Sequence, residues 1–304
     1  MAVPVRRRVV SSAAPKGRIP TPFFYLDLND TVRRAVLLTA AVTNKIPTAD
    51  SLKREYVRAL EQINGAPLNI AGQPRIVAGG PILRAARAKG LVDDSVPASS
   101  YRPASRTVAI KHTRHGLLFL RLQHPPLYDL CDLLITDILC WPSVESSGGS
   151  QADLLGIVWI VPSGELTSLD IAEFVIHEMV HMNLTLADMT VGLFTRAPGS
   201  HFKAHSAVLG RRRPHDLAFH SACVAVAMIY FRLLVGLHGE VEWLRASLQR
   251  CTSELLDHRA AFTRCSWNAI LAAHAFSRAP RLAAIPVHKD LTRAGLPLKE
   301  GTSS

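Results

Sequence analysis

The chain has 304 residues, of which 48% are hydrophobic, and these values suit a globular protein with a sizeable core rather than a disordered or fibrous chain. Its formal net charge of +11 favours an acidic partner, such as a peptide segment or a small acidic co-substrate. Nucleic acid is disfavoured as a partner because the sequence has no zinc-finger spacing or RNP-like segment, and aromatic residues make up only 6%. The five cysteines are odd in number and form no CxxC, which predicts reduced thiols and a cytoplasmic protein.

The order of elements predicts an α+β fold that is predominantly helical. A basic arm is expected at 1–25, a single catalytic domain at 26–298 with a sub-boundary near 143–151, and a loose tail at 299–304. The longest apolar run is too short for a bilayer span, so no membrane partner is expected. The predicted elements are helices at 31–45 (capped by Asp30), 49–63 and 82–89, a strand at 106–111, a helix at 126–140 and a strand at 155–161, followed by a motif-bearing helix, a loop at 195–214, and helices at 216–236 and 240–276.

The motif-bearing helix contains the segment His177-Glu178-Met179-Val180-His181, which is an HExxH motif. On a helix, this spacing places two imidazoles on one face with a carboxylate beside them. Thr167 with Asp170 predicts a capped start for the helix. Two neutral imidazoles one turn apart bind first-row metals better than Ca²⁺ or Mg²⁺, so iron or zinc is expected.

The third metal ligand is not given by the motif. A metzincin continuation is absent because Leu184 and Ala187 stand where Gly and His are required, and no Glu occurs between Glu178 and Glu240. We expect His220 as the third ligand, on a buried helix that Asp216 opens and that packs against the HExxH helix. The alternatives are that His220 is a core histidine, or that an acidic residue, Asp188, Asp216 or Glu240, completes the site. His201, His205 and His215 fall in a basic loop, where solvent exposure or substrate contact is expected.

Arg213-Pro214 followed by Leu217, Phe219 and His220-Ser221 resembles the RP-x(5)-HG segment of the HExxH-motif proteins associated with ribosomally made, post-translationally modified peptides. The approach from Leu155-Gly156-Ile157-Val158-Trp159-Ile160 to the HExxH helix is also similar to that family. The resemblance covers about residues 150 to 240, and Ser221 departs from the family's usual Gly.

The resemblance implies an Fe(II)- and 2-oxoglutarate-dependent dioxygenase that uses O2 to hydroxylate a carbon, with a β-carbon favoured, of a residue in a precursor peptide. His177, His181 and His220 would then bind iron. The distal carboxylate of 2-oxoglutarate would pair with Arg211, Arg212 or Arg213, of which Arg213 occupies the place of the motif's Arg. A solvated basic loop is the alternative interpretation of these arginines.

The role of Glu178 separates two reaction classes. In an oxygenase it would orient His181 or shape the open side of the metal. In a zinc metallopeptidase or amidase it would act as the general base on a zinc-bound water. A third interpretation is a metal-stabilised peptide-binding protein without catalytic activity. The sequence does not indicate the oligomeric state.

Overall fold

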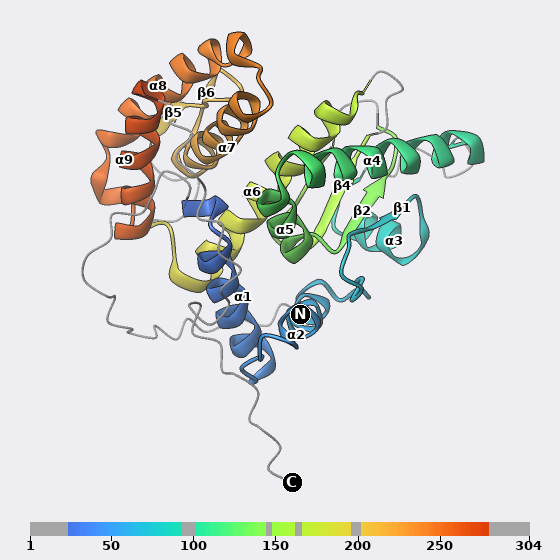
Figure 1. Cartoon of the computed structure of the whole chain (residues 1–304). Helices are drawn as coiled ribbons and strands as arrows, with labels where there is room; N and C mark the ends of the chain where they lie inside the picture. Colours follow the sequence, from blue (N-terminus) through green and yellow to red (C-terminus); the bar gives the residue numbers. More distant parts are fainter. Residues whose placement is uncertain (1–23, 93–100, 144–147, 162–165, 196–201, 280–304) are drawn as a thin grey trace.

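The computed structural model describes residues 24–92, 101–143, 148–161, 166–195 and 202–279 (Figure 1). The predicted basic arm, apart from its last two residues, and the predicted loose tail lie outside the described residues. The elements in chain order are α1 (Leu28–Thr43), α2 (Leu52–Asn64), β1 (Arg75–Val77), α3 (Gly80–Ala88), α4 (Pro103–Gln123), α5 (Pro125–Leu134), β2 (Asp137–Cys140), β3 (Gly148–Gly149), β4 (Ile157–Ile160), α6 (Ser168–Val191), β5 (Lys203–His205), β6 (Arg212–Pro214), α7 (His215–Leu234), α8 (Glu242–Leu256) and α9 (Arg264–Arg278).

The main sheet has the strand order β1-β2-β4-β3. Strands β1, β2 and β4 are parallel, and β3 pairs antiparallel with β4 through Gly148 opposite Ile160 and Gly149 opposite Trp159. All residues of β2 and β4 are buried, which is typical of parallel strands covered on both faces. The short β3 therefore forms one edge of the sheet.

Helix α6 is the element around which the rest of the molecule is arranged. It begins at a capping box in which the Thr167 hydroxyl accepts from the Asp170 backbone N–H and the Asp170 carboxylate accepts from the Thr167 backbone N–H. It contacts α4 and α5 on the side of the main sheet and α7 on the other side. Figure 1 shows it running between these two groups of helices. The predicted capping residues of the HExxH helix are thus confirmed.

Helix α7 is apolar nearly all round and largely buried. It is the one helix among the described residues that is long and apolar enough to cross a membrane, with 67% of its apolar window buried inside the protein. A core helix of a soluble protein passes the same test. Helices α8 and α9 pack against α7 and against each other.

A buried amide connects α1 to α6. Asn183 of α6 donates to the Tyr25 carbonyl at 2.7 Å and to the Thr31 hydroxyl at 2.8 Å, and its side-chain oxygen accepts from Arg34 at 3.0 Å. These bonds satisfy the polar atoms that the contact buries.

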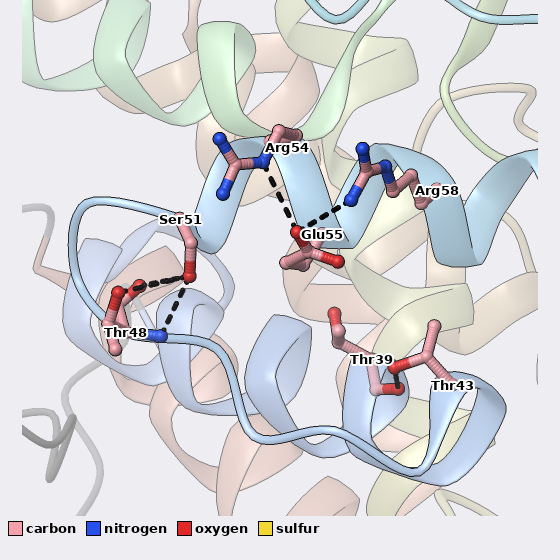
Figure 2. A network of polar contacts seen from close by, with 7 residues as sticks. All are labelled: Thr39, Thr43, Thr48, Ser51, Arg54, Glu55 and Arg58. Atoms are coloured by element: carbon pink, nitrogen blue, oxygen red, sulfur yellow. Dashed lines mark hydrogen bonds and ion pairs between the residues drawn. The ribbon is translucent and has the colours of Figure 1, made fainter.

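The connection from α1 to α2 is held by local polar contacts (Figure 2). The Ser51 hydroxyl accepts from the Thr48 backbone N–H at 2.9 Å, immediately before α2 begins. One turn later, Glu55 accepts from Arg54 and Arg58.

The fold class is confirmed as α+β and predominantly helical. The secondary structure predicted for two segments was wrong. The predicted strand at 106–111 lies inside α4, because Pro103 occupies the first helical turn and residues at helical spacing, including Ala109 and Thr113, are buried. The last four residues of the predicted helix at 126–140 form β2, which pairs in parallel with β1 and β4, and Asp137 pairs with Arg75 at 2.6 Å.

Other boundaries also differ from the predictions. Asp27, not Asp30, caps α1, since its carboxylate accepts from the Asp30 backbone N–H. Pro214 precedes α7, and Asp216 lies within the first turn instead of capping it. The predicted loop at 195–214 contains the hairpin of β5 and β6. The predicted helix at 240–276 is divided, because Phe262 adopts an extended conformation and forms a β-bridge with Phe194.

The packing of α4 on α6 generates a stability prediction. A Cβ atom added at Gly116 would lie 2.3 Å from Cγ2 of Ile171, although Ala is ordinarily the better helix former. We expect Gly116→Ala to lower the free energy of unfolding by about 1–3 kcal/mol, measured by urea denaturation. Gly239→Ala is the control because no atom lies within 4 Å of its added Cβ. Equal stability of the two variants would contradict the close approach of α4 and α6.

Candidate metal centre

The structure brings together the three histidines that the sequence analysis selected. His177 and His181 lie one turn apart on α6, and their Nε2 atoms are 3.2 Å apart. His220 projects from α7, and its Nδ1 atom lies 3.4 Å from Nδ1 of His181. The central ring of this histidine trio, His177, His181 and His220, is therefore that of His181.

The spacing of the trio can be compared with that of a metal site. Two nitrogens bound at 2.0–2.1 Å to one ion are separated by about 2.8–3.4 Å at right-angled to tetrahedral geometry. The Nε2 atoms of His177 and His181 fit this range at 3.2 Å. His181 uses its other nitrogen, Nδ1, toward His220. A single ion could therefore contact all three rings only after the ring of His181 or of His220 changes its orientation.

Within the part of the chain that the structure describes, no group of three or more His, Cys, Asp or Glu side chains is already arranged as a metal cage. The two short nitrogen contacts also suit hydrogen bonds in which one neutral ring donates to the next. The fit to a metal therefore rests on donor chemistry and on the spacing of the pair in α6.

Partial burial favours the neutral form of the three rings. It lowers the pKa of His177 to about 4 and the pKa of His220 to about 4. The pKa of His181 also falls well below its ordinary value, first because of burial and then because of the neighbouring His177, His220 and Arg213. A neutral imidazole has a free lone pair on one ring nitrogen, so the trio presents ligand-competent rings near pH 7.

Two contacts hold the His220 end of the trio. The ring of Phe194 stacks on that of His220, with centroids 6.4 Å apart and an angle of 25° between the planes. Next to it, the Ser221 hydroxyl lies 2.7 Å from that of Ser206 and accepts from the Val208 backbone N–H at 2.9 Å. Ser221 thus anchors the connection between β5 and β6 to α7, which gives a structural role to the residue that departs from the family pattern.

Glu178 faces the edge of the main sheet. Ser150, directly after β3, donates to its Oε2 atom at 2.6 Å, and its Oε1 atom lies 3.9 Å from Nε2 of His177. Burial raises the pKa of Glu178 to about 7, and the hydrogen bond from Ser150 acts in the opposite direction. The sequence analysis identified neither Ser150 nor Phe194. The Gly-Gly-Ser run gave no chemical signal, because only its antiparallel pairing with β4 brings Ser150 to α6.

The three candidate arginines differ in their surroundings. Arg213 is half-buried, and its charge contributes to the lowered pKa values of both His181 and His220. Arg212 is exposed, donates to the Lys203 carbonyl and lies 3.8 Å from Glu254. Arg211 is exposed. Arg213 is therefore the arginine whose charge reaches the histidine trio.

The acidic residues considered as third ligands lie elsewhere or serve other contacts. Asp188 accepts from the Leu193 backbone N–H at 2.7 Å, at the end of α6. Asp216 sits in the first turn of α7 and opposes the lowering of the His220 pKa. Glu240 is exposed in a short 3₁₀ helix beyond α7.

Among the remaining histidines, His205 pairs with Glu254 at 2.6 Å. His215 is buried, in contact with the rings of Phe202 and Phe262. Of the two expectations for His215, solvent exposure is therefore wrong, and substrate contact stays a prediction. His201 lies outside the described residues.

Comparison of the chain with models of known protein families and with curated proteins gives no match. The site is therefore interpreted from its own geometry and chemistry.

Metal affinity tests the assembly of the trio. We expect His177→Ala or His181→Ala to lower Zn²⁺ or Co²⁺ affinity by more than about 100-fold, since even changes outside the ligand shell cost about 10- to 100-fold. His220→Ala should lower it by at least about 10-fold. The measurement is competition with a chromophoric chelator, and His115→Ala on the exposed face of α4 is the control. Unchanged affinity in His220→Ala would remove His220 from the ligand set.

Proposed function

We propose that this protein is a non-haem iron, 2-oxoglutarate-dependent oxygenase that hydroxylates a carbon, with a β-carbon favoured, of a residue in a ribosomally made peptide. The observation that carries the proposal is the contact of three partly buried histidines from α6 and α7. The charge of Arg213 acts on two of them, His181 and His220. The peptide substrate rests on the resemblance of the segment from Arg213 to Ser221 to the HExxH peptide-modification family.

In this proposal, His177, His181 and His220 hold the metal as neutral ligands. Bound ferrous iron would supply activation of O2 coupled to the oxidative decarboxylation of 2-oxoglutarate, which is the chemistry that inserts oxygen into an unactivated C–H bond. Three neutral ligands leave the positive charge of the metal uncompensated by the protein, so a dianionic co-substrate is favoured at the site. A cytoplasmic setting suits both the ferrous ion and the free cysteines.

Arg213 is assigned to the distal carboxylate of 2-oxoglutarate. Arg213 is a half-buried residue on β6, and its charge acts on His181 and His220. A partly desolvated guanidinium pairs with a carboxylate more strongly than an exposed one does. Arg212 is already engaged by Lys203 and Glu254.

Glu178 supports the alternative function, a zinc metallopeptidase or amidase. Its carboxyl group lies beside His177, and its raised pKa of about 7 suits a group that exchanges a proton near neutral pH. In the oxygenase, the same group held by Ser150 would shape the open side of the metal without exchanging a proton.

Two assays separate these functions. The oxygenase predicts consumption of 2-oxoglutarate and a mass gain of one oxygen atom in a peptide, under air but not under nitrogen. Glu178→Gln should then retain measurable uncoupled consumption of 2-oxoglutarate. Anaerobic peptide cleavage that a zinc chelator stops and Glu178→Gln abolishes would establish the hydrolase instead. Peptide binding without either reaction would indicate a catalytically silent binding protein.

The assignment of Arg213 gives a kinetic prediction. We expect Arg213→Gln to raise the KM for 2-oxoglutarate by about 10- to 100-fold, the size of one lost charge-assisted contact, with a smaller change in kcat. Arg211→Gln is the matched control, since it removes the same charge two residues away from an exposed site. Equal effects of the two substitutions, measured in steady-state assays, would contradict a specific role for Arg213.

A further inference from the structure

A second concave region lies between α4, α6 and the end of β4. It has a volume of about 380 Å³, within the range of about 300–1,000 Å³ that is usual for small-molecule sites. Its walls are mostly apolar and include Tyr101, Val108, Ala109, Ile160 and Ile171, while Ser105, His112 and Thr113 supply the polar groups. We refer to it as the α4 pocket.

Small residues on α4 and fixed neighbours create this space. Ala104, Ser105 and Ala109 line it from α4. Tyr101 packs edge-on against the buried Trp141, with ring centroids 5.6 Å apart. The Thr113 hydroxyl lies 3.3 Å from the Cys140 sulfur at the end of β2. The walls are thus held by the core, and the pocket lies at the carboxyl ends of the parallel strands β2 and β4, where open α/β sheets commonly bind ligands.

The α4 pocket lies on the face of α6 that carries Glu178, the neighbour of His177 in the candidate metal centre. Ile171 of the pocket and Glu178 are seven residues apart, which puts them on the same face at an axial separation of about 10 Å. Between them, the Phe174 ring packs under Gly148, where an added Cβ would lie 2.5 Å from it. Strand β3 and the residue after it therefore lie along this face. Gly148 pairs with Ile160, and Ser150 donates a hydrogen bond to Glu178.

We infer that the α4 pocket binds an apolar side chain of the substrate, such as that of Leu or Phe, about three residues from the part of the peptide that lies beside Glu178. The separation follows from the axial distance, since an extended chain advances about 3.3 Å per residue. No acidic or basic side chain other than His112 lines the pocket among the described residues, so a charged side chain would be desolvated there without a partner. The inference rests on the proposed peptide substrate.

The test uses small probes that need neither metal nor turnover. Binding of 4-methylpentanamide, a mimic of the Leu side chain, to the full chain is measured by saturation-transfer NMR, with the anionic succinamate as a comparison. We expect the apolar probe to bind and succinamate to bind at least about 10-fold more weakly, the difference expected from desolvating a charge.

Two substitutions fill the α4 pocket. Ala109→Phe fills it from within, and Val108→Trp fills it from a position whose side chain is 49% exposed, so folding is spared. Each should weaken binding of 4-methylpentanamide by at least about 10-fold, the loss expected from excluding a small apolar group. Ala88→Phe on the exposed end of α3 is the matched control and should bind as the unmodified chain does. Equal binding by Val108→Trp, or no binding by the unmodified chain, would overturn the inference.

Peptide competition links the pocket to the substrate. The peptide Gly-Gly-Leu-Gly-Gly should displace the probe, and Gly-Gly-Ser-Gly-Gly should not. If neither peptide displaces a bound probe, the α4 pocket is not a peptide side-chain site. If the probe and the Leu peptide bind but no peptide is oxidised, the proposed oxygenase activity fails while the pocket assignment stands.

Discussion

The partial burial of three neighbouring imidazoles between α6 and α7 is the constraint on which the proposed site depends. A charged imidazole in such a place is costly, so the rings stay neutral and their pKa values fall to about 4 at His177 and His220. The same packing that forms the core thus favours the neutral imidazoles that a metal would require. Helix α7 supplies this desolvation because it is apolar nearly all round.

Polar contacts set the geometry around this core. Asn183 connects α6 to α1 through Arg34 and Thr31, and to the segment before α1 through the Tyr25 carbonyl. Ser150, from the sheet edge, orients Glu178, and Phe194 stacks on His220 from the segment after α6. These contacts come from four different parts of the chain. The site is therefore a property of the tertiary fold, and HExxH alone supplies only two of its three imidazoles.

The sequence predicted the parts of the structure that local patterns determine. Periodicity and capping predicted three elements of the structure: the capped HExxH helix, the strand near 155–161 and the buried helix with His220. The strand expected at 106–111 failed because packing of α4 on α6 overrides the β-propensity of Thr107, Val108 and Ile110. The parallel partners β1 and β2 were missed because short strands without turn signals depend on long-range pairing.

Within the site, the choice of His220 followed from its place on an apolar helix, and the structure brings its ring to His181. The orientation of the His220 ring relative to His177 depends on side-chain packing that no sequence pattern encodes. Ser150 could not be predicted from the sequence, because its contact with Glu178 arises from the pairing of β3 with β4. The α4 pocket likewise results from small residues on α4 opposite Ile171 of a distant helix.

The most direct test of the central claim is a crystal structure of the protein with Fe(II) added under anaerobic conditions. The account predicts one ion bound at about 2.0–2.2 Å by a nitrogen from each of His177, His181 and His220, with open positions facing Arg213. An ion held by His177 and His181 with a carboxylate in place of His220, or crystals that bind no ion at the trio, would contradict it.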